Sequence, residues 1–447
     1  MSFPFTLSRR VLSGAVPPPA ADVVVVGGGV IGVMTALFLA RAGVRVVLLE
    51  KGRVAAEQSS RNWGWIRAQG RDPAELPIAM EARRLWSDIA ADLDEDIGLR
   101  TTGVTYLAPD ARRMDSYVRW QAVASAQGLD CEVLDAGDVA AMLPGAGQRW
   151  AGAIRTPSDL RAEPSLAVPA VARRAIAAGA VICEGCAVRG LDVAGGRIAG
   201  VLTERGRVVA SEVVVAGGAW SRLLLQRHGI AIPQLSVRST ALATEPMPQM
   251  FDGAAVDDRL AFRRRMDGGY TLAPSAAQEL YVGRDAVASL GAYLPQLRAD
   301  PLGTRLLPAA PSGFPDAWAT PRRWSGDSAS PFEAVRVLNP APNRRRVAAT
   351  LAAFAATFPQ AGPVRARVAW AGMIDTMPDI VPVVDRAESL PGLTIATGMS
   401  GHGFGIGPAF GRIAAALVTG GAVGHDMHRF RLSRFSDGSR VELGPLV

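Results

Sequence analysis

Three glycines and an acidic residue near the start of the chain have the spacing of a dinucleotide-binding motif. Gly27, Gly29 and Gly32 follow four consecutive valines, and Glu50 ends the next apolar run. Gly27 permits a tight turn, Gly29 lets the backbone approach a pyrophosphate, and Gly32 lets a helix pack on the strand. The helix N-terminus attracts phosphate, and Glu50 can accept hydrogen bonds from ribose hydroxyls. The pattern therefore predicts a dinucleotide site.

Two of the three cysteines, Cys183 and Cys186, have the spacing of a metal-binding or redox pair. No second pair accompanies them, and they lie in a strand-like run whose side chains would not turn toward one metal ion. No cluster of histidines and carboxylates suggests a metal site either. We expect no metal, and the low cysteine content fits a reducing compartment.

The composition is typical of a globular protein with more than one domain. The chain has 447 residues, of which 49% are hydrophobic and 20% charged, and no apolar stretch is long enough to span a bilayer. The formal net charge is +7, but the arginines are scattered. We expect no nucleic acid partner and interpret the charge as a basin for anionic ligands.

The first residues resemble a targeting segment only in part. Ser8, Arg9 and Arg10 resemble a twin-arginine export signal, but three prolines at 17–19 replace the longer apolar region and the cleavage site. We interpret residues 1–20 as an N-terminal extension. The expected location is the cytoplasm, with peripheral attachment at the inner face of the membrane as the alternative.

The pattern of the remaining chain predicts an α/β (α+β) fold in which two domains interleave. Buried strands are expected at 23–26, 44–50, 181–188, 213–215 and 393–397, and helices at 78–93, 112–127, 164–178, 348–358 and 411–418. Gly195-Gly196 marks a hairpin. We assign 21–70, 151–237 and 366–447 to a Rossmann-like nucleotide-binding domain, and 71–150 and 238–365 to a mixed-sheet substrate domain.

Four blocks in this order resemble the D-amino-acid oxidase-like (DAO) family of FAD-dependent oxidoreductases. They are the motif from Gly27 to Glu50, the segment 59–67, the strand and glycines at 213–220, and the glycine-rich segment 397–404. The resemblance implies FAD as the cofactor. No histidine or cysteine follows Glu50 where some members attach flavin, so we expect non-covalent binding.

Carried over by position, the family's cofactor contacts fall on residues of all four blocks. The segment from Gly401 to Ile406 would present backbone N–H groups at a helix start, which stabilises the negative charge of a reduced flavin. The residues implied to bind FAD are Gly27, Gly29, Val30, Ile31, Gly32, Glu50, Lys51, Ser59, Ser60, Arg61, Asn62, Trp63, Gly64, Val188, Ala216, Gly217, Trp220, Gly372, Gly401, His402, Gly403, Phe404, Gly405 and Ile406.

The chain departs from the family pattern where substrate carboxylate and oxygen are handled. Members that act on simple D-amino acids carry an arginine where this chain has Ile374. Lys51 is the only lysine and follows the ribose-binding acid directly, so it cannot activate oxygen above the flavin. Other residues are therefore expected to bind the substrate.

Five residues are candidates for binding substrate. Trp65 could wall the site, Arg67 could bind a carboxylate, and Asp375 could face a cationic group. Arg263 and Arg265 share one face of a strand before an Asp-Gly-Gly turn, so Arg265 and Tyr270 are candidates to replace the missing arginine. His402 is the candidate catalytic residue as a proton shuttle, with packing or a hydrogen bond to flavin as the alternative.

The expected reaction is FAD-dependent oxidation of an amine or amino acid, with hydride transfer to flavin N5 and hydrolysis of the resulting imine. The first alternative is a 2-hydroxy-acid dehydrogenase, which would need His402 as a base. The second is a flavin-binding subunit of a hetero-oligomeric dehydrogenase. Oxygen, a quinone or a carrier could accept the electrons, and homo- or hetero-oligomers are both open.

Overall fold

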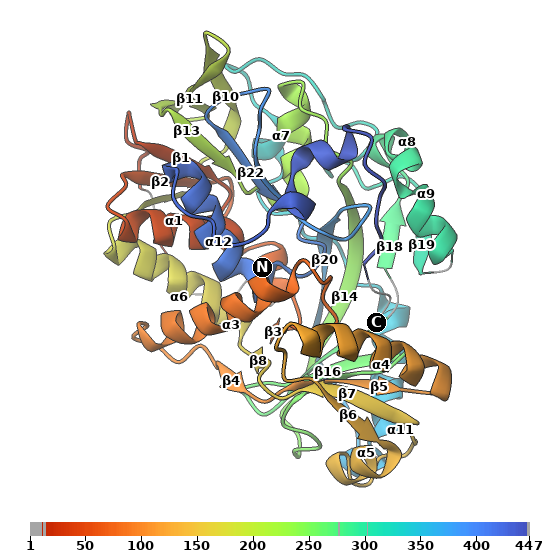
Figure 1. Ribbon diagram of the computed structural model, residues 1–447. Helices are drawn as coiled ribbons and strands as arrows, with labels where there is room; N and C mark the ends of the chain where they lie inside the picture. Colours follow the sequence, from red (N-terminus) through yellow and green to blue (C-terminus); the bar gives the residue numbers. More distant parts are fainter. Residues whose placement is uncertain (1–10, 12–14, 276–277, 302, 445–447) are drawn as a thin grey trace.

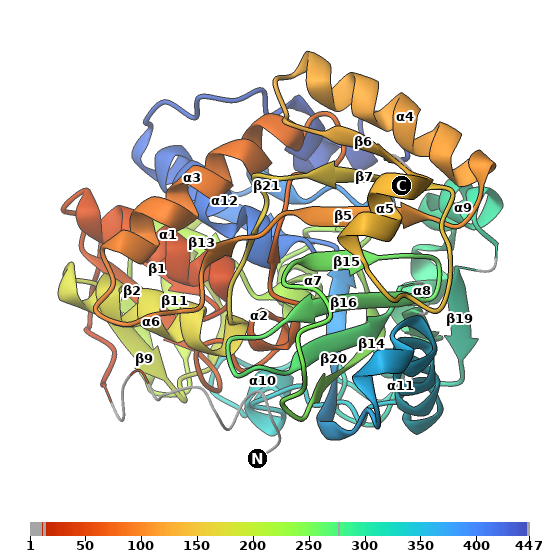
Figure 2. The ribbon, with the colours of Figure 1, turned by 90° about the horizontal axis from the view of Figure 1, so that it is seen from below.

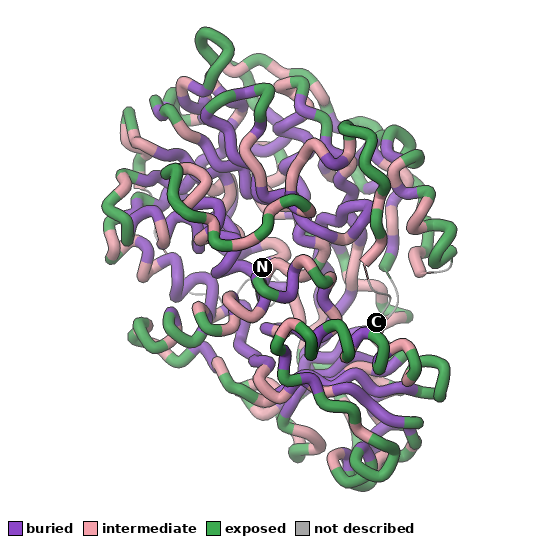
Figure 3. The backbone as a smooth tube through the Cα atoms, in the orientation of Figure 1, coloured by how far each residue is buried: buried purple, intermediate pink, exposed green. Residues whose placement is uncertain are grey.

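The computed structural model describes residues 11, 15–275, 278–301 and 303–444. The twin-arginine-like segment at 8–10 therefore lies outside the described residues. Two large sheets dominate the molecule, and strands β14 and β20 run through its middle (Figure 1). Figure 3 shows the interior strands buried, whereas the outer faces of helices α4 and α5 are exposed. Among the described residues, no helix combines the length and apolarity needed to cross a membrane.

The first sheet has six strands in the order β21-β22-β13-β1-β2-β9, all parallel to their neighbours except β21. Parallel strands buried on both faces favour continuous apolar runs, which explains the four valines of β1. The strands are β1 (Val23–Val26), β2 (Val46–Glu50), β9 (Val181–Glu184), β13 (Glu212–Val215), β21 (Val383–Arg386) and β22 (Leu393–Thr397).

Alternate valines of β1 serve two different cores. Val23 and Val25 pack in a cluster with helices α1 (Val30–Arg41), α6 (Pro164–Ala177) and α12 (Gly403–Thr419). Val24 and Val26 pack in a second cluster on the opposite face, as the two-residue period of a strand requires. The small sheet β10 (Val188–Ala194), β11 (Arg197–Thr203) and β12 (Gly206–Val209) covers that face.

The predicted strand at 181–188 is in fact two strands, β9 and β10. Gly185 adopts a φ of +62°, which breaks the strand and sends β10 into the small sheet. The predicted hairpin at Gly195-Gly196 is confirmed, because Ala194 pairs with Arg197 across it.

Helix α12 packs very closely on α1 through its glycines. A Cβ atom at Gly411 would lie 2.4 Å from Met34 Cβ, and one at Gly407 would lie 2.7 Å from Val30 Cγ2. The helix begins at Gly403, eight residues before the predicted start. The close contact therefore places the N-termini of α1 and α12 side by side.

The second sheet has ten strands, in the order β19-β18-β14-β17-β16-β15-β5-β7-β6 with β20 paired to β14. Figure 2 shows β14 and β20 side by side with α11 beside them. The strands are β5 (Val104–Ala108), β6 (Glu132–Asp135), β7 (Gly152–Thr156), β14 (Leu235–Thr244), β15 (Ala254–Val256), β16 (Leu260–Arg264), β17 (Tyr270–Pro274), β18 (Gln278–Tyr281), β19 (Thr304–Leu307) and β20 (Ala366–Thr376).

Two strands of this sheet fall in ranges that we predicted for the nucleotide-binding domain. Strand β7 pairs with β5 and β6, and β20 pairs with β14 along most of its length. The alternation of a strand shows that one of its faces is buried, but it does not say which sheet the strand joins. The predicted boundaries at 151 and 366 therefore disagree with the strand pairing.

The remaining elements connect and cover the two sheets. A small sheet contains β3 (Trp65–Ile66), β4 (Arg100–Thr101) and β8 (Leu160–Arg161). The other helices are α2 (Gln58–Arg61), α3 (Leu76–Ala91), α4 (Ala111–Ala126), α5 (Ala136–Met142), α7 (Ser221–Arg227), α8 (Arg284–Ala288), α9 (Leu290–Ala299), α10 (Pro331–Ala334), α11 (Arg344–Thr357) and the short 3₁₀ helices 218–220, 359–361, 428–430 and 432–435.

Candidate active site

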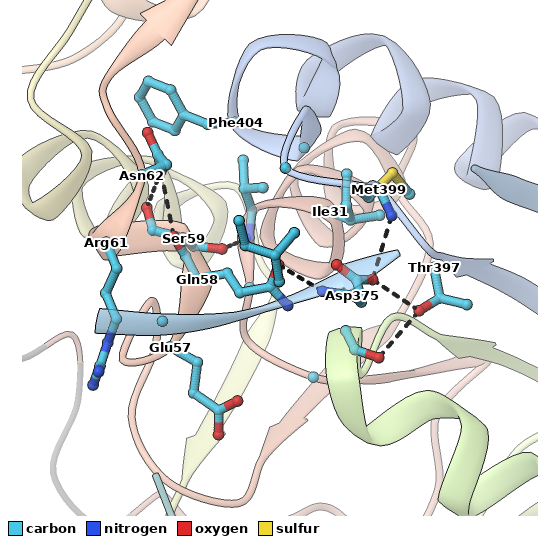
Figure 4. Close-up of a pocket in the computed structure, with 18 of the residues that line it drawn as sticks. Ile31, Glu57, Gln58, Ser59, Arg61, Asn62, Asp375, Thr397, Met399 and Phe404 are labelled. Atoms are coloured by element: carbon cyan, nitrogen blue, oxygen red, sulfur yellow. Dashed lines mark hydrogen bonds between the residues drawn. The ribbon is translucent and has the colours of Figure 1, made fainter. Parts of the chain in front are cut away.

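A cavity of about 350 Å³ is lined by residues of both large sheets (Figure 4). One end contains the turn between β1 and α1, the end of β2, and Val188. The other end contains β3, the middle of β14 and β20, and the start of α12. The first end has the residues predicted to bind a nucleotide, and we call it the nucleotide end. We call the other the substrate end.

The turn before α1 can pack on the segment after β13 only because Gly27 has no side chain. Gly27 has a φ of +110°, and a Cβ atom there would lie 2.5 Å from the Ala216 carbonyl oxygen. The Ser59 hydroxyl accepts a hydrogen bond from the Val30 N–H at 2.8 Å, which fixes α2 against the helix start. Gly32 packs on the Gly27 carbonyl and does not line the cavity. The turn fits a dinucleotide phosphate.

Glu50 retains acceptor capacity for a ribose. Its Oε2 atom accepts from the Gly28 N–H at 2.7 Å, and its Oε1 atom accepts from the Gly52 N–H at 2.6 Å. Each carboxylate oxygen has two lone-pair sites, so each can still accept a hydroxyl. Burial raises the pKa of Glu50, and the neighbouring Lys51 opposes that rise. The residues at this end therefore fit the adenosine half of FAD.

Lys51 lines the cavity, but its ammonium group is already occupied. It donates to Glu57 Oε1 at 2.8 Å, to the Val335 carbonyl at 2.9 Å and to the Arg336 carbonyl at 3.1 Å. It also lies 4.3 Å from the centre of the Trp220 ring. A lysine has three donors, so none remains for the cofactor. The predicted direct contact is not supported, and Lys51 instead holds the segment 335–336 beside the site.

The Arg61 side chain also differs from the prediction of a cofactor ligand. Its guanidinium donates to the Ala56 carbonyl, to Asn339 Oδ1 at 2.7 Å and to the Ala371 carbonyl at 2.8 Å. In Figure 4 it extends away from Asp375. Arg61 thus ties α2 to β20, and Gly372 of that strand lines the cavity beside it.

The remaining predicted cofactor residues divide into two groups. Ile31, Asn62, Trp63, Gly217, Gly401, His402, Gly403 and Phe404 line the cavity. Ser60, Gly64, Gly405 and Ile406 do not, because they pack behind it: a Cβ atom at Gly405 would lie 3.3 Å from the Trp65 carbonyl oxygen. The start of α12 is therefore pressed against β3.

Asp375 lines the cavity, but it is buried and held by several hydrogen-bond donors. Its Oδ2 atom accepts from the Gly398 N–H at 2.7 Å, from the Met399 N–H at 3.3 Å and from Gln234 Nε2 at 3.3 Å. Figure 4 shows Asp375 linked to Thr397 and to the Met399 backbone. These donors bind Oδ2, so Asp375 holds the turn between β22 and α12, and its contact with a substrate cation stays a prediction.

Arg265 and Tyr270 lie outside the cavity, so neither replaces the missing arginine. The Tyr270 side chain is fully buried, and its hydroxyl bonds to the backbone of Met250 and Phe251. Arg265 pairs with Asp267 at 3.1 Å, and Glu163 lies 3.7 Å away. The hairpin was predicted correctly, and Arg263 and Arg265 do share a face toward Glu163.

The substrate end brings together Trp65, Arg67 and His402, and it adds Arg71, which the sequence analysis missed. Trp63 and Trp65 meet edge to face with ring centres 5.2 Å apart. Burial lowers the pKa of Arg71 to about 9, so Arg71 stays charged at neutral pH. The spacing of four residues from Arg67 through Arg71 to Glu75 was the available signal.

His402 lies against a buried carboxylate. Its Nδ1 atom is 3.3 Å from Glu75 Oε2. Burial lowers the pKa of His402 to about 4, and Arg71 adds to the shift. Burial opposes ionisation of Glu75, but His402 and the arginines outweigh it and hold the pKa of that carboxyl below its usual value. At neutral pH the pair is a neutral imidazole beside a carboxylate.

Cys183 and Cys186 are buried free thiols. Burial raises the pKa of Cys183 to about 11, so it is not a thiolate at neutral pH. Within the described ranges, no group of three potential metal ligands comes together.

Comparison with known proteins identifies relatives across the chain. It is 28% identical to mouse mitochondrial sarcosine dehydrogenase over 272 residues, which cover 57% of this chain and 29% of that protein. The beta subunit of sarcosine oxidase from Rhizobium meliloti is 24% identical over 93% of this chain and 88% of its own length. The structure of L-amino acid deaminase from Proteus myxofaciens in complex with anthranilate superposes with a TM-score of 0.91, at 29% identity and 96% coverage of both chains.

The chain spans less than a third of the length of the sarcosine dehydrogenases that it matches. A family match extends over residues 22–417, which include both large sheets and every residue of the cavity. The chain belongs to the DAO family of FAD-dependent oxidoreductases.

Proposed function

We propose that this protein oxidises the C–N bond of an amine or amino acid. The observation that carries the proposal is the continuity of one cavity, in which a nucleotide cradle and an end lined by tryptophans and arginines meet at the start of α12. FAD, when bound, accepts a hydride from the carbon next to nitrogen. Relatives named for sarcosine oxidation and for L-amino acid deamination support the reaction class.

The side chains of the substrate end orient the substrate and exclude water. Trp63 and Trp65 form an apolar wall, and Arg67 provides positive charge beside it. The start of α12 lies against β3, so the positive end of its dipole faces the same space and stabilises negative charge there. The imine product leaves for hydrolysis to a carbonyl compound.

We assign His402 a hydrogen-bonding role at the start of α12. A pKa of about 4 makes its imidazole a weak base. A 2-hydroxy-acid dehydrogenase would need a strong base to remove the hydroxyl proton. The observed environment of His402 therefore favours amine oxidation, in which a neutral amine needs little help from a base.

A second candidate is the same chemistry within a larger assembly. Two relatives that cover nearly the whole chain, from Rhizobium meliloti and Rhodobacter capsulatus, are named as beta subunits of sarcosine oxidase. The native mass of the protein purified from its own cells discriminates between an enzyme that acts alone and a subunit of a larger complex. A stable complex with other chains would favour the subunit.

We propose a quinone or a protein carrier as the electron acceptor, because the only lysine lies at the nucleotide end with all its donors engaged. We also propose a cytoplasmic location and an oligomer of identical chains. Anaerobic addition of amines, amino acids and hydroxy acids to the yellow protein tests the reaction. Bleaching of the flavin band by an amine or amino acid is expected, and bleaching by a hydroxy acid alone would contradict the proposal.

A further inference from the structure

We propose that Arg67 and Arg71 form a subsite for one carboxylate, so that the substrate is an amino acid with an uncharged side chain and not a simple amine. This inference rests on the proposed function. In the family pattern, an arginine at the position of Ile374 binds the substrate carboxylate. We assign that role here to the two arginines that follow β3.

Both guanidinium groups line the substrate end without a paired carboxylate. No acidic oxygen of the described residues lies within 4.0 Å of either group, whereas other buried arginines, such as Arg263 and Arg434, form such pairs. Arg67 donates to the Gln69 carbonyl and lies over the Tyr106 ring. Arg71 donates through Nε to the Arg67 carbonyl at 3.4 Å. Their remaining donors are available to a ligand.

Two buried donors at this end have no partner. Arg71 is 2% exposed and Trp65 is 7% exposed, and both line the cavity. In the part of the chain that the structure describes, Arg71 Nη1 and Trp65 Nε1 are buried with no hydrogen-bond acceptor. A buried donor without an acceptor costs about 1–3 kcal/mol. An anion with several acceptor sites, such as a carboxylate, would satisfy both.

The charges around the subsite leave one positive charge unbalanced. Arg83 pairs with the buried Asp159 at 3.1 Å, so those two groups compensate each other. Glu75 is the remaining buried carboxylate, and its nearest cationic partner is His402, which is neutral at neutral pH. Two guanidinium groups therefore face one carboxylate, and a single anionic group completes the balance.

The rest of the substrate end offers no second cationic anchor among the described residues. Apart from Asp375, whose Oδ2 atom accepts from the Gly398 and Met399 N–H groups, the other residues that line it are neutral, and several are small or apolar. Lys51, Arg53 and Arg61 follow β2 at the nucleotide end, and Lys51 and Arg61 are held by other partners. The neutral residues are Trp63, Ser239, Ala241, Pro274, Ser275, Gln278, Ile374, Met399 and Ser400. This lining fits a substrate that has one carboxylate and an uncharged side chain.

Binding calorimetry on the FAD-loaded protein tests the subsite with a matched pair of unreactive probes. The probes are 4-methylpentanoate and its amide, which have the same shape and differ in charge. We expect the carboxylate to bind at least about tenfold more tightly, or 1.4 kcal/mol. Arg71→Met and Arg67→Met should each remove at least about that factor for the carboxylate and leave the amide unchanged. Arg71→Lys should lose less.

Arg100→Met is the matched control, because Arg100 is an exposed arginine that pairs with Asp96 outside the cavity. It removes the same charge and should not change either affinity. If Arg71→Met fails to retain FAD, the wild-type comparison of the two probes and Arg67→Met still decide the question.

Equal affinity for acid and amide, or unchanged carboxylate affinity in the Arg67 variant, would overturn the inference. So would variants that weaken FAD binding alone, because the arginines would then face the flavin. The proposed function fails separately, if no amine or amino acid bleaches the flavin while the carboxylate probe still binds.

Discussion

The Nδ1 atom of His402 lies 3.3 Å from Oε2 of Glu75, and this contact joins the start of α12 to the start of α3. Both groups are buried beneath the substrate end of the cavity. The contact therefore links the helix that faces the flavin site to the segment that carries Arg67 and Arg71.

The pKa of His402 predicts a pH dependence of stability. Its pKa falls from 6.5 to about 4 on folding, so the unfolded chain binds more protons between these values. Stability from this group is present above pH 6.5 and is lost as the pH falls toward 4. We expect His402→Asn to flatten the dependence of the melting temperature on pH across this window. An unchanged slope would show that His402 is not held neutral by the fold.

The contact between Gly411 and Met34 predicts intolerance of a side chain on α12. A Cβ atom at Gly411 would lie 2.4 Å from Met34 Cβ, so Gly411→Ala should cost roughly 1–3 kcal/mol of unfolding free energy. Gly291→Ala is the control, because Gly291 is also helical and nothing lies within 4 Å of its Cβ position. That variant should be neutral or stabilising by about 0.5–1 kcal/mol. Denaturant unfolding measures both, and equal effects would argue against close packing of α1 and α12.

Lys51 is expected to affect cofactor retention and not turnover. Lys51→Met removes the donor that holds the carbonyls of Val335 and Arg336, and the nearby Phe332 lines the cavity. We expect FAD to dissociate about tenfold faster, since hydrogen bonds to charged groups contribute about 1.5–3 kcal/mol each. The KM for substrate should stay the same. A change in KM with unchanged FAD release would place the lysine at the substrate instead.

Arg265 provides a contrast with Arg67. Because Arg265 pairs with Asp267 outside the cavity, Arg265→Met should leave the KM for an amino acid within about twofold of wild type. Arg67→Met should raise it at least about tenfold. Steady-state kinetics on both variants give the comparison. If Arg265→Met raises KM and Arg67→Met does not, the position of the subsite is wrong.

Local patterns predicted much of the fold correctly. The valine run, the Gly195-Gly196 hairpin and the helix at 164–178 depend on residues close in sequence, and the structure confirms them. Strands β7 and β20 fall in ranges predicted for the nucleotide-binding domain, but they pair in the second sheet. Pairing between distant segments leaves no local signal in the sequence.

The site, too, could be predicted from the sequence only where local spacing reflects its task. The glycines before α1 and the acid at the end of β2 follow a spacing that reflects their task, and the structure places Gly27 and Glu50 together as expected. Arg265 and Asp375 have plausible chemistry in sequence, but distant partners occupy both side chains. Arg71 matches no known motif, and apart from its four-residue spacing from Arg67 and Glu75, only its burial beside the cavity reveals it.

We propose that this cavity binds FAD and that the protein oxidises an amino acid at a C–N bond. The most direct test follows the absorption spectrum of the FAD-loaded protein without oxygen, while neutral amino acids and the matching amines that lack a carboxylate are added. We predict that an amino acid bleaches the flavin band and that the matching amine does so only at far higher concentration. Failure of every amine and amino acid to bleach a bound flavin would contradict the account.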